Sequence, residues 1–243
     1  MMHEQSSATV VLGVETSGAT GGIALLQDHK LIDTISFSLG GQLHSQLLLP
    51  AIKEILTKSN LHLKDLSCIA VSQGPGSFTG LRIGLSVSNA IGWFLKIPIV
   101  GIDTMESFAS LAMETVSLEK SQLICTLSDA KQEKFYYSLF KVVMNGNVKT
   151  LERVEQNQAG TLSDIERIIK QPTHFCGDKI LYNKTEQFTQ VFKDNLILCP
   201  YMELPSAVAI ARVASAKFSS HYFDSNVSEP NYVRVGYHSK TVK

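Results

Sequence analysis

One stretch of the chain has residue types and spacing that could serve chemistry, a glycine-rich run between an apolar strand and an amphipathic helix. It reads Gly74-Pro75-Gly76-Ser77-Phe78-Thr79-Gly80-Leu81-Arg82-Ile83-Gly84. Glycine and proline at this density indicate a tight, rigid loop whose backbone can approach another group closely. A strand, a glycine-rich loop and a helix commonly direct backbone N–H groups at a phosphate. The same geometry also lets two helices pair, so the loop alone leaves both uses open.

The glycine-rich run departs from the standard nucleotide-binding patterns. Thr79 stands where a dinucleotide motif has its third glycine, and Asp103 lies farther from Gly74 than the roughly 20 residues expected of a ribose-binding acid. The Gly-Lys-Ser/Thr of a phosphate-binding P-loop is missing as well. These mismatches argue against a dinucleotide-binding or P-loop fold.

The cysteines and histidines predict no metal or nucleophile site. Cys68, Cys125, Cys176 and Cys199 lie in apolar runs and never as Cys-x-x-Cys, which favours reduced, buried thiols in a cytosolic protein. The seven histidines are scattered, and no G-x-S-x-G elbow occurs. We therefore assign no catalytic residue and no metal ligand.

Composition limits the class of protein. With 243 residues, 44% of them hydrophobic, the chain can bury one large core or two smaller ones. The 22 basic and 22 acidic side chains balance, which argues against a protein that binds nucleic acid by itself. No apolar run reaches the roughly 20 residues of a membrane span, and the first residues lack the pattern of a secretory signal.

Hydrophobic periodicity predicts the same order of elements twice. In the first half we expect strands at 10–14, 22–26 and 30–38, a helix at 44–58 bent by Pro50, a strand at 66–72, a helix at 80–95 and a strand at 97–102. In the second half we expect strands near 122–128, 134–143 and 148–155, a helix at 161–170, a strand at 173–176, a helix at 183–192, a strand at 195–199 and a helix at 206–219. Two βββαβα units predict an α/β protein of the tandem actin-like (ASKHA, RNase H-like) architecture, with lobes at 1–104 and 105–243.

Small residues recur every fourth position in the helix behind the loop, at Gly84, Ser88 and Gly92. Such a stripe lets another element approach closely, at a cost of up to about 1 kcal/mol per glycine in helix propensity. It either packs against the chain's own sheet or forms an exposed pairing face together with helix 44–58. On the second interpretation, the partner interface consists of Leu47, Leu48, Ala51, Ile52, Leu81, Gly84, Leu85, Ser88 and Gly92.

The first hairpin offers a second candidate site. Proteins of the actin and sugar-kinase type place a phosphate loop at the position of 15–18, where Glu15 could hold Mg²⁺. A polar turn between two strands explains the same residues. A matching second phosphate loop is missing, because Ser128-Asp129-Ala130-Lys131 lacks glycine. A complete kinase site is therefore not expected.

Five stretches together resemble the TsaB family. They are Val14-Glu15-Thr16-Ser17, His44-Ser45 before Leu48-Leu49-Pro50, the run 74–84, Asp129-Ala130-Lys131 and Pro230-Asn231-Tyr232-Val233-Arg234. The likeness covers nearly the whole chain and is strongest over 10–110. It implies a tandem actin-like fold and a role in making threonylcarbamoyladenosine beside the tRNA anticodon. Glu15 stands where the family often has Asp, which weakens any Mg²⁺ site there.

The resemblance also implies partners. In that family this subunit is not the catalyst: the paralogue TsaD carries a metal-binding histidine pair and transfers the threonylcarbamoyl group, and the ATPase TsaE joins the complex. Helices 44–58 and 80–95 match the family's pairing helices, which bind TsaD or form a homodimer without it. The resemblance thus implies a cytoplasmic activating subunit that meets tRNA only through the complex, with a nucleotide (ATP or ADP) at the subunit boundary. The alternative is a stand-alone actin-like ATPase or small-molecule phosphotransferase.

Overall fold

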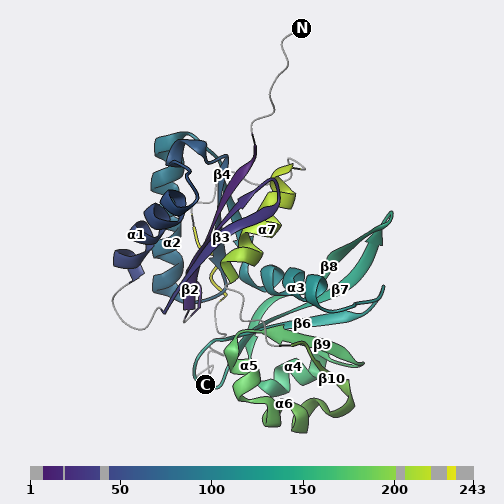
Figure 1. The fold of residues 1–243 in the computed structure, drawn as a ribbon. Coiled ribbons are helices and arrows are strands. Elements are labelled where there is room, and N and C mark those ends of the chain that lie inside the picture. Colours follow the sequence, from purple (N-terminus) through teal and green to yellow (C-terminus); the bar gives the residue numbers. More distant parts are fainter. Residues whose placement is uncertain (1–7, 19, 39–43, 201–205, 220–228, 234–243) are drawn as a thin grey trace. The chain divides into compact units, whose positions relative to one another are not determined.

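The computed structural model describes residues 8–18, 20–38, 44–200, 206–219 and 229–233 (Figure 1). Arg234 of the C-terminal motif therefore lies outside the described residues, as do the side chains of His44 and Ser45. The chain divides into two compact units. The first comprises Met1–Ser107 and Glu203–Asn231, and the second comprises Phe108–Met202 and Tyr232–Lys243.

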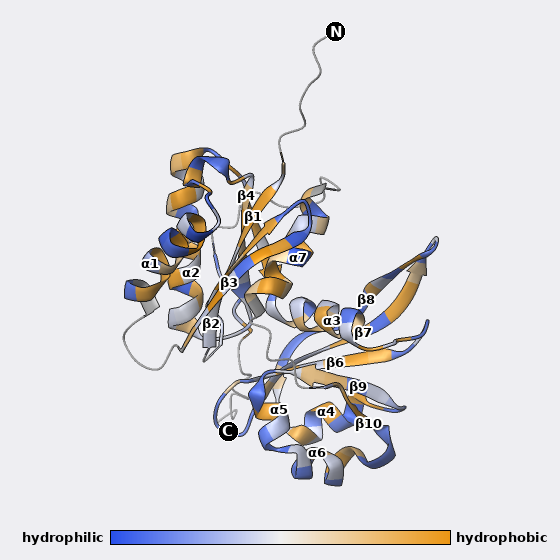
Figure 2. Ribbon diagram, in the orientation of Figure 1, coloured by the Kyte–Doolittle hydropathy of each residue, from blue (hydrophilic) through white to orange (hydrophobic). Residues whose placement is uncertain are grey.

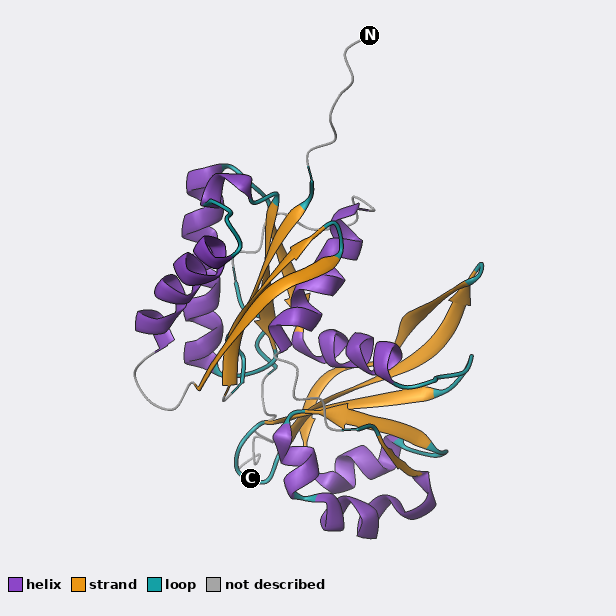
Figure 3. Cartoon of the chain, viewed as in Figure 1, coloured by secondary structure: helices purple, strands orange, loops and turns teal. Residues whose placement is uncertain are grey.

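The first unit is built on a five-stranded mixed sheet in the order β3-β2-β1-β4-β5 (Figure 3). Its strands are β1 (Val10–Glu15), β2 (Thr20–Gln27), β3 (Lys30–Ser38), β4 (Cys68–Gly74) and β5 (Ile99–Asp103). β1 pairs with β2 and β2 with β3 in antiparallel fashion, whereas β1–β4 and β4–β5 are parallel pairs. The carboxyl ends of β1, β4 and β5 therefore lie at one edge of the sheet.

Helices cover both faces of this sheet (Figure 1). α1 (His44–Lys58) and α2 (Phe78–Leu95) pack on one face, where Leu12 and Val14 contribute to the core. α7 (Ser206–Ser219) packs on the other, against Val11 and its neighbours. The central strands β1 and β4 are buried on both faces and mostly hydrophobic, as the colours of Figure 2 show, with polar residues at their carboxyl ends.

The second unit contains a sheet in the order β10-β9-β6-β7-β8. Its strands are β6 (Leu123–Asp129), β7 (Phe135–Asn145), β8 (Val148–Gly160), β9 (Thr173–Gly177) and β10 (Leu196–Leu198), and its helices are α4 (Leu162–Ile168), α5 (Lys179–Asn183) and α6 (Thr185–Phe192). These helices cover one face of the sheet over an aromatic core (Figure 1). In that core the Phe188 ring lies edge-on to Phe135 and Phe175, with centroids 5.4 and 6.3 Å apart.

The fold class is confirmed: both sheets have three antiparallel-linked strands followed by parallel ones, the α/β arrangement predicted for each lobe. Three helical regions differ from the prediction. One helix was predicted at 183–192, but the structure has α5 at 179–183 and α6 at 185–192. α3 (Thr104–Thr115) was not predicted, and it begins at the end of the first unit and continues in the second. α7 was assigned to a lobe at 105–243, yet it packs on the first sheet because its buried alanines contact β1 and β2. No helix in the described part of the chain is long and apolar enough to cross a membrane.

Candidate partner-binding surface

The glycine-rich loop connects β4 to α2 and rests against the C-terminal motif. Gly74 has φ +111°, and a Cβ there would lie 2.7 Å from the Asn231 carbonyl oxygen, so glycine is required on both grounds. The Gly74–Pro75 peptide bond is cis. The Asn231 N–H donates to the Gln73 carbonyl (2.7 Å), and Gln73 Nε2 donates to the Glu229 carbonyl (3.0 Å). Two of the stretches that resemble the TsaB family thus lie side by side.

Three amide groups of the glycine-rich run, those of Ser77, Gly80 and Leu81, are used within the chain. Ser77 N–H donates to the Ser17 carbonyl (2.7 Å), and the Ser77 hydroxyl caps α2 by accepting from Gly80 N–H (3.2 Å). Leu81 N–H in turn donates to the Ser77 carbonyl (2.9 Å). A phosphate at this helix N-terminus would compete with these bonds. The bond from Ser77 N–H to the Ser17 carbonyl holds the first hairpin against the start of α2.

Glu15 ends β1 and is 1% exposed. One carboxylate oxygen accepts from Ser17 N–H, and the other, Oε2, has no hydrogen-bond partner. Burial raises the pKa of Glu15 above its ordinary value, although hydrogen bonds from Ser17 and Ser72 act in the opposite direction. Burial thus opposes the charged carboxylate that Mg²⁺ binding requires.

The corresponding edge of the second sheet carries two carboxylates. Asp178 Oδ2 accepts from the Ser128 hydroxyl (2.8 Å) and Asp129 N–H (2.9 Å), while Oδ1 accepts from Ile180 N–H (2.9 Å). Asp129 accepts from the Lys131 ammonium (2.6 Å). Burial opposes ionisation, but the Lys131 hydrogen bonds and the charges of Lys131 and Lys184 lower the pKa of Asp129. These contacts order the turn and cap α5. No group of three metal-ligating side chains occurs among the residues that the structure describes.

The small-residue stripe of α2 faces the chain's own sheet. A Cβ at Gly84 would collide with the Thr16 hydroxyl, and one at Gly92 would lie 2.7 Å from Ile99 Cδ1. Ser88 is completely buried. The interpretation of Gly84, Ser88 and Gly92 as an exposed pairing face is therefore corrected, because β1 and β5 occupy that face.

The other residues of the predicted interface are also mostly internal. Leu48, Ala51, Ile52, Leu81 and Leu85 are at most 7% exposed, and all but Leu81 belong to the core between the helices and the first sheet. Leu47 is half-buried. Helices α1 and α2 pack together as predicted, but these side chains hold the helices to the sheet. A partner would meet their outward faces.

The outward face of α2 carries large apolar side chains. Phe78 is 54% exposed, Trp93 83% and Phe94 74%. At about 100° per residue, Phe78, Arg82, Ser86 and Trp93 lie within roughly 80° of one another on the helix surface. Leu49, on the neighbouring α1, is 52% exposed as well. We call Leu49, Phe78, Trp93 and Phe94 the aromatic face.

A groove of about 360 Å³ lies along the first half of this face. Its walls are formed by Phe78, Thr79, Arg82, Ile83, Ser86 and Val87. The Arg82 guanidinium stacks on the Phe78 ring, 3.9 Å from its centroid, which is a cation–π geometry that leaves the ring edge outward. The motif residues Phe78, Thr79 and Arg82 thus contribute side chains to the surface, whereas Gly74, Pro75, Gly76 and Gly80 shape the loop beneath it.

Sequence reasoning missed Leu49, Trp93 and Phe94 as surface residues. The signal was present, because Trp93 lies across the helix from the glycine stripe and must point outward once the stripe faces the sheet. The two interpretations of the stripe gave opposite orientations of α2, so the outward residues could be named only after one of them was excluded.

The fold class follows from the two units. Each unit has a five-stranded mixed sheet covered by helices, and two such units in one chain make a tandem actin-like protein. The ROK hexokinase of Thermus thermophilus is similar to 87% of this chain and 100% of its own, with TM-score 0.53 and 12% identity. A Pseudomonas aeruginosa protein described as having similarity to peptidase YEAZ is similar to 93% of this chain and 100% of its own, with TM-score 0.74 and 19% identity.

Sequence comparison narrows the class. The family model described as TsaD, tRNA N6-adenosine threonylcarbamoyltransferase, matches residues 38–235. The tRNA threonylcarbamoyladenosine biosynthesis protein TsaB of Bacillus subtilis (strain 168) is 32% identical over 170 residues, which are 69% of this chain and 70% of that protein. The chain belongs to the TsaB family, within the wider group that this family model describes.

Proposed function

We propose that the chain is a non-catalytic subunit that binds and activates a TsaD-type transferase, which adds a threonylcarbamoyl group to the adenosine next to the tRNA anticodon. The observation that carries the proposal is the aromatic face: Phe78, Trp93 and Phe94 are exposed on one helix of a TsaB-family chain. Residues 38–235 match the family model that describes the transferase itself, so a transferase partner would have a fold related to that of this chain. Two related chains can pair through equivalent helices.

The aromatic face is large enough to contribute substantially to binding. Exposures of 54%, 83% and 74% for Phe78, Trp93 and Phe94 correspond to on the order of 400 Å² of apolar surface. That is about half of the roughly 800 Å² that each partner contributes to a standard interface. At about 25 cal/mol per Å², burying it favours association by about 10 kcal/mol before the association costs of about 4–15 kcal/mol. Leu49 and the groove supply further area.

The same surface bears on the other members of the assembly. Without the transferase, we propose that two copies of this chain pair through the aromatic face, since an apolar patch of this size is rarely left open. A TsaE-type ATPase and the tRNA join through the transferase complex. Three amides of the glycine-rich run are bonded within the chain, and we propose that a nucleotide (ATP or ADP) binds at the boundary with the partner.

Light scattering after size-exclusion tests the proposal, on this chain alone and mixed with a TsaD-type transferase. We expect a one-to-one complex that Trp93→Glu weakens at least about 30-fold, since a central aromatic contributes about 2 kcal/mol or more. The matched control is Val148→Glu, another exposed apolar position (64%), on β8 of the second unit, which should leave the complex unchanged.

Circular dichroism must show that both variants remain folded. Unchanged binding by Trp93→Glu would exclude the aromatic face as the interface. No complex at micromolar concentrations, together with nucleotide binding by the isolated chain, would instead favour a stand-alone actin-like enzyme.

A further inference from the structure

Two cysteines of the second unit are brought together by strand register. β9 and β10 are parallel, with Phe175 opposite Leu198. Cys199 N–H donates to the Phe175 carbonyl (2.9 Å), so the ladder continues one residue beyond β10. Phe175 and Leu198 face the aromatic core. Because strand side chains alternate, the next residues, Cys176 and Cys199, both face the opposite side of the sheet.

The distance between neighbouring strands suits a cross-link. Adjacent strands lie about 4.8 Å apart, and disulfides span Cα separations of about 4.4–6.8 Å. Both cysteines are free and buried, at 0% and 2% exposure. The Cys176 thiol also lies 3.6 Å from the Phe108 carbonyl of α3, in the part of that helix belonging to the second unit.

The two thiols influence one another as a reactive pair does. Contact with Cys199, followed by burial, raises the pKa of Cys176, whereas the hydrogen bond from Cys176 lowers the pKa of Cys199 against the effect of burial. Cys199 is therefore the thiol that ionises first and attacks, and Cys176 is the one that resolves.

Cys125 belongs to the aromatic core, on the side of the sheet that Phe175 faces, and it acts on Cys176 only through its charge. Cys68 lies in the first unit, on β4. Burial raises the pKa of Cys68 to about 12 and raises that of Cys125 as well. Both are inert as nucleophiles near neutral pH.

We propose that Cys176 and Cys199 form a dithiol site that closes to a disulfide on reaction with low-molecular-weight disulfides. The Cys199 thiolate attacks one sulfur of the reagent, whose S–S bond breaks and whose other half leaves as a thiolate. Cys176 then attacks the Cys199 sulfur of the mixed disulfide, releasing the second half of the reagent. The protein loses two hydrogens, and the reagent is reduced to two thiols.

Access to Cys199 comes from the edge of the sheet. β10 has three residues, pairs only with β9 among the described strands, and exposes Ile197 by 38%. A short edge strand opens locally at lower free energy than central strands. Once closed, the disulfide ties this edge to β9 and encloses residues 177–198, which include α5 and α6.

Peptide mapping of the full-length chain tests the proposal. The reduced protein is incubated with oxidised glutathione, remaining thiols are alkylated in denaturant, and digestion is done without reductant. We expect one cross-linked peptide pair containing Cys176 and Cys199, with Cys68 and Cys125 alkylated. The oxidised protein should melt at least about 3 °C higher than the reduced one, and reductant should reverse this shift.

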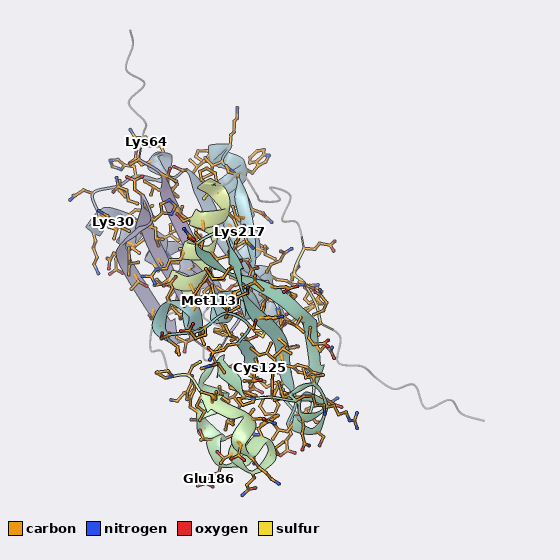
Figure 4. All side chains as sticks on the ribbon, turned by 90° about the vertical axis from the view of Figure 1, so that its right-hand side faces the viewer. Lys30, Lys64, Met113, Cys125, Glu186 and Lys217 are labelled. Carbon is orange, nitrogen blue, oxygen red and sulfur yellow. The ribbon has the colours of Figure 1, made fainter. Side chains whose placement is uncertain are left out.

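Variants distinguish the pair from general thiol oxidation. Cys176→Ser should leave glutathione attached to Cys199, and Cys199→Ser should leave Cys176 unmodified. Cys125→Ser is the matched control, since this buried thiol of the same unit lies on β6 (Figure 4). In this variant the cross-link between Cys176 and Cys199 should form as in the wild type. A stable glutathione adduct in the wild type, a cross-link involving Cys125, or no modification of the folded chain would each overturn the proposal.

Discussion

Replacing the buried carboxyl of Glu15 by an amide should stabilise the first unit at neutral and alkaline pH. Glu15 is 1% exposed, and its Oε2 has no hydrogen-bond partner. Burial raises the folded-state pKa above the unfolded value of 4.5. The neutral form is therefore favoured in the folded protein, whereas the unfolded chain ionises freely. Glu15→Gln keeps the size of the side chain and the oxygen that accepts from Ser17 N–H, and it removes the ionisation.

The sign of the pH effect follows from proton linkage. Between the unfolded and folded pKa values the native state binds one more proton than the unfolded state, so stability falls as pH rises. The stabilising contribution of Glu15 is complete below the unfolded pKa and is lost as pH rises through the folded pKa. Within that window the wild type loses about 1.4 kcal/mol per pH unit relative to Glu15→Gln. The total equals about 1.4 kcal/mol for each pH unit between the unfolded and folded pKa values.

Urea unfolding, monitored by far-UV circular dichroism from pH 4.5 to 8.5, measures this difference. Glu15→Gln should match the wild type at the acid end and exceed it increasingly toward the alkaline end. The control is Glu54→Gln, which breaks an exposed ion pair with Lys58 and should change stability little at any of these pH values. A stability difference for Glu15→Gln that stays constant with pH, or that favours the wild type at alkaline pH, would refute the argument.

Two further substitutions test the packing of the site. Gly84→Val should destabilise the chain by about 1–3 kcal/mol in urea unfolding, because its side chain enters the space of the Thr16 hydroxyl. The control Ser86→Val, on the outward face, should change stability by less than about 0.5 kcal/mol. Equal effects of the two substitutions would contradict the assigned orientation of α2. Asp178→Ala should cost about 2–3 kcal/mol, since three donors lose their acceptor; a melting temperature within 1–2 °C of the wild type would show that solvent replaces these bonds.

Local patterns predicted most of the fold because each depends on neighbouring residues. The paired strand and helix patterns gave both lobes in the correct order, and the boundaries of α1 and α7 agree with the prediction. α3 was missed although Met105, Ala109 and Ala112 are buried at helical spacing. The attachment of α7 to the first sheet could not be predicted, since it depends on contacts with strands nearly 200 residues earlier in the chain.

The candidate site was predicted only in part for a related physical reason. Periodicity identified α2 as a helix with one small-residue side, and a glycine stripe fits close packing against a partner helix or against the chain's own sheet equally well. The choice depends on Thr16 and Ile99, which reach the stripe only in the folded unit. Thr79 and Arg82 were assigned to the loop motif from sequence, and the structure places both in the wall of the groove.

The inward face of α2 contributes to the stability of the chain, and its outward face is the one proposed to bind a partner. The inward face carries glycines, each costing up to about 1 kcal/mol in helix propensity, and this cost is offset by the close approach of the helix to β1 and β5. The same approach directs Phe78 and Trp93 to solvent, where they contribute little to the stability of the isolated chain. Inward substitutions such as Gly84→Val therefore act first on unfolding. If the proposed function holds, outward substitutions such as Trp93→Glu should act on complex formation and leave the unfolding midpoint nearly unchanged.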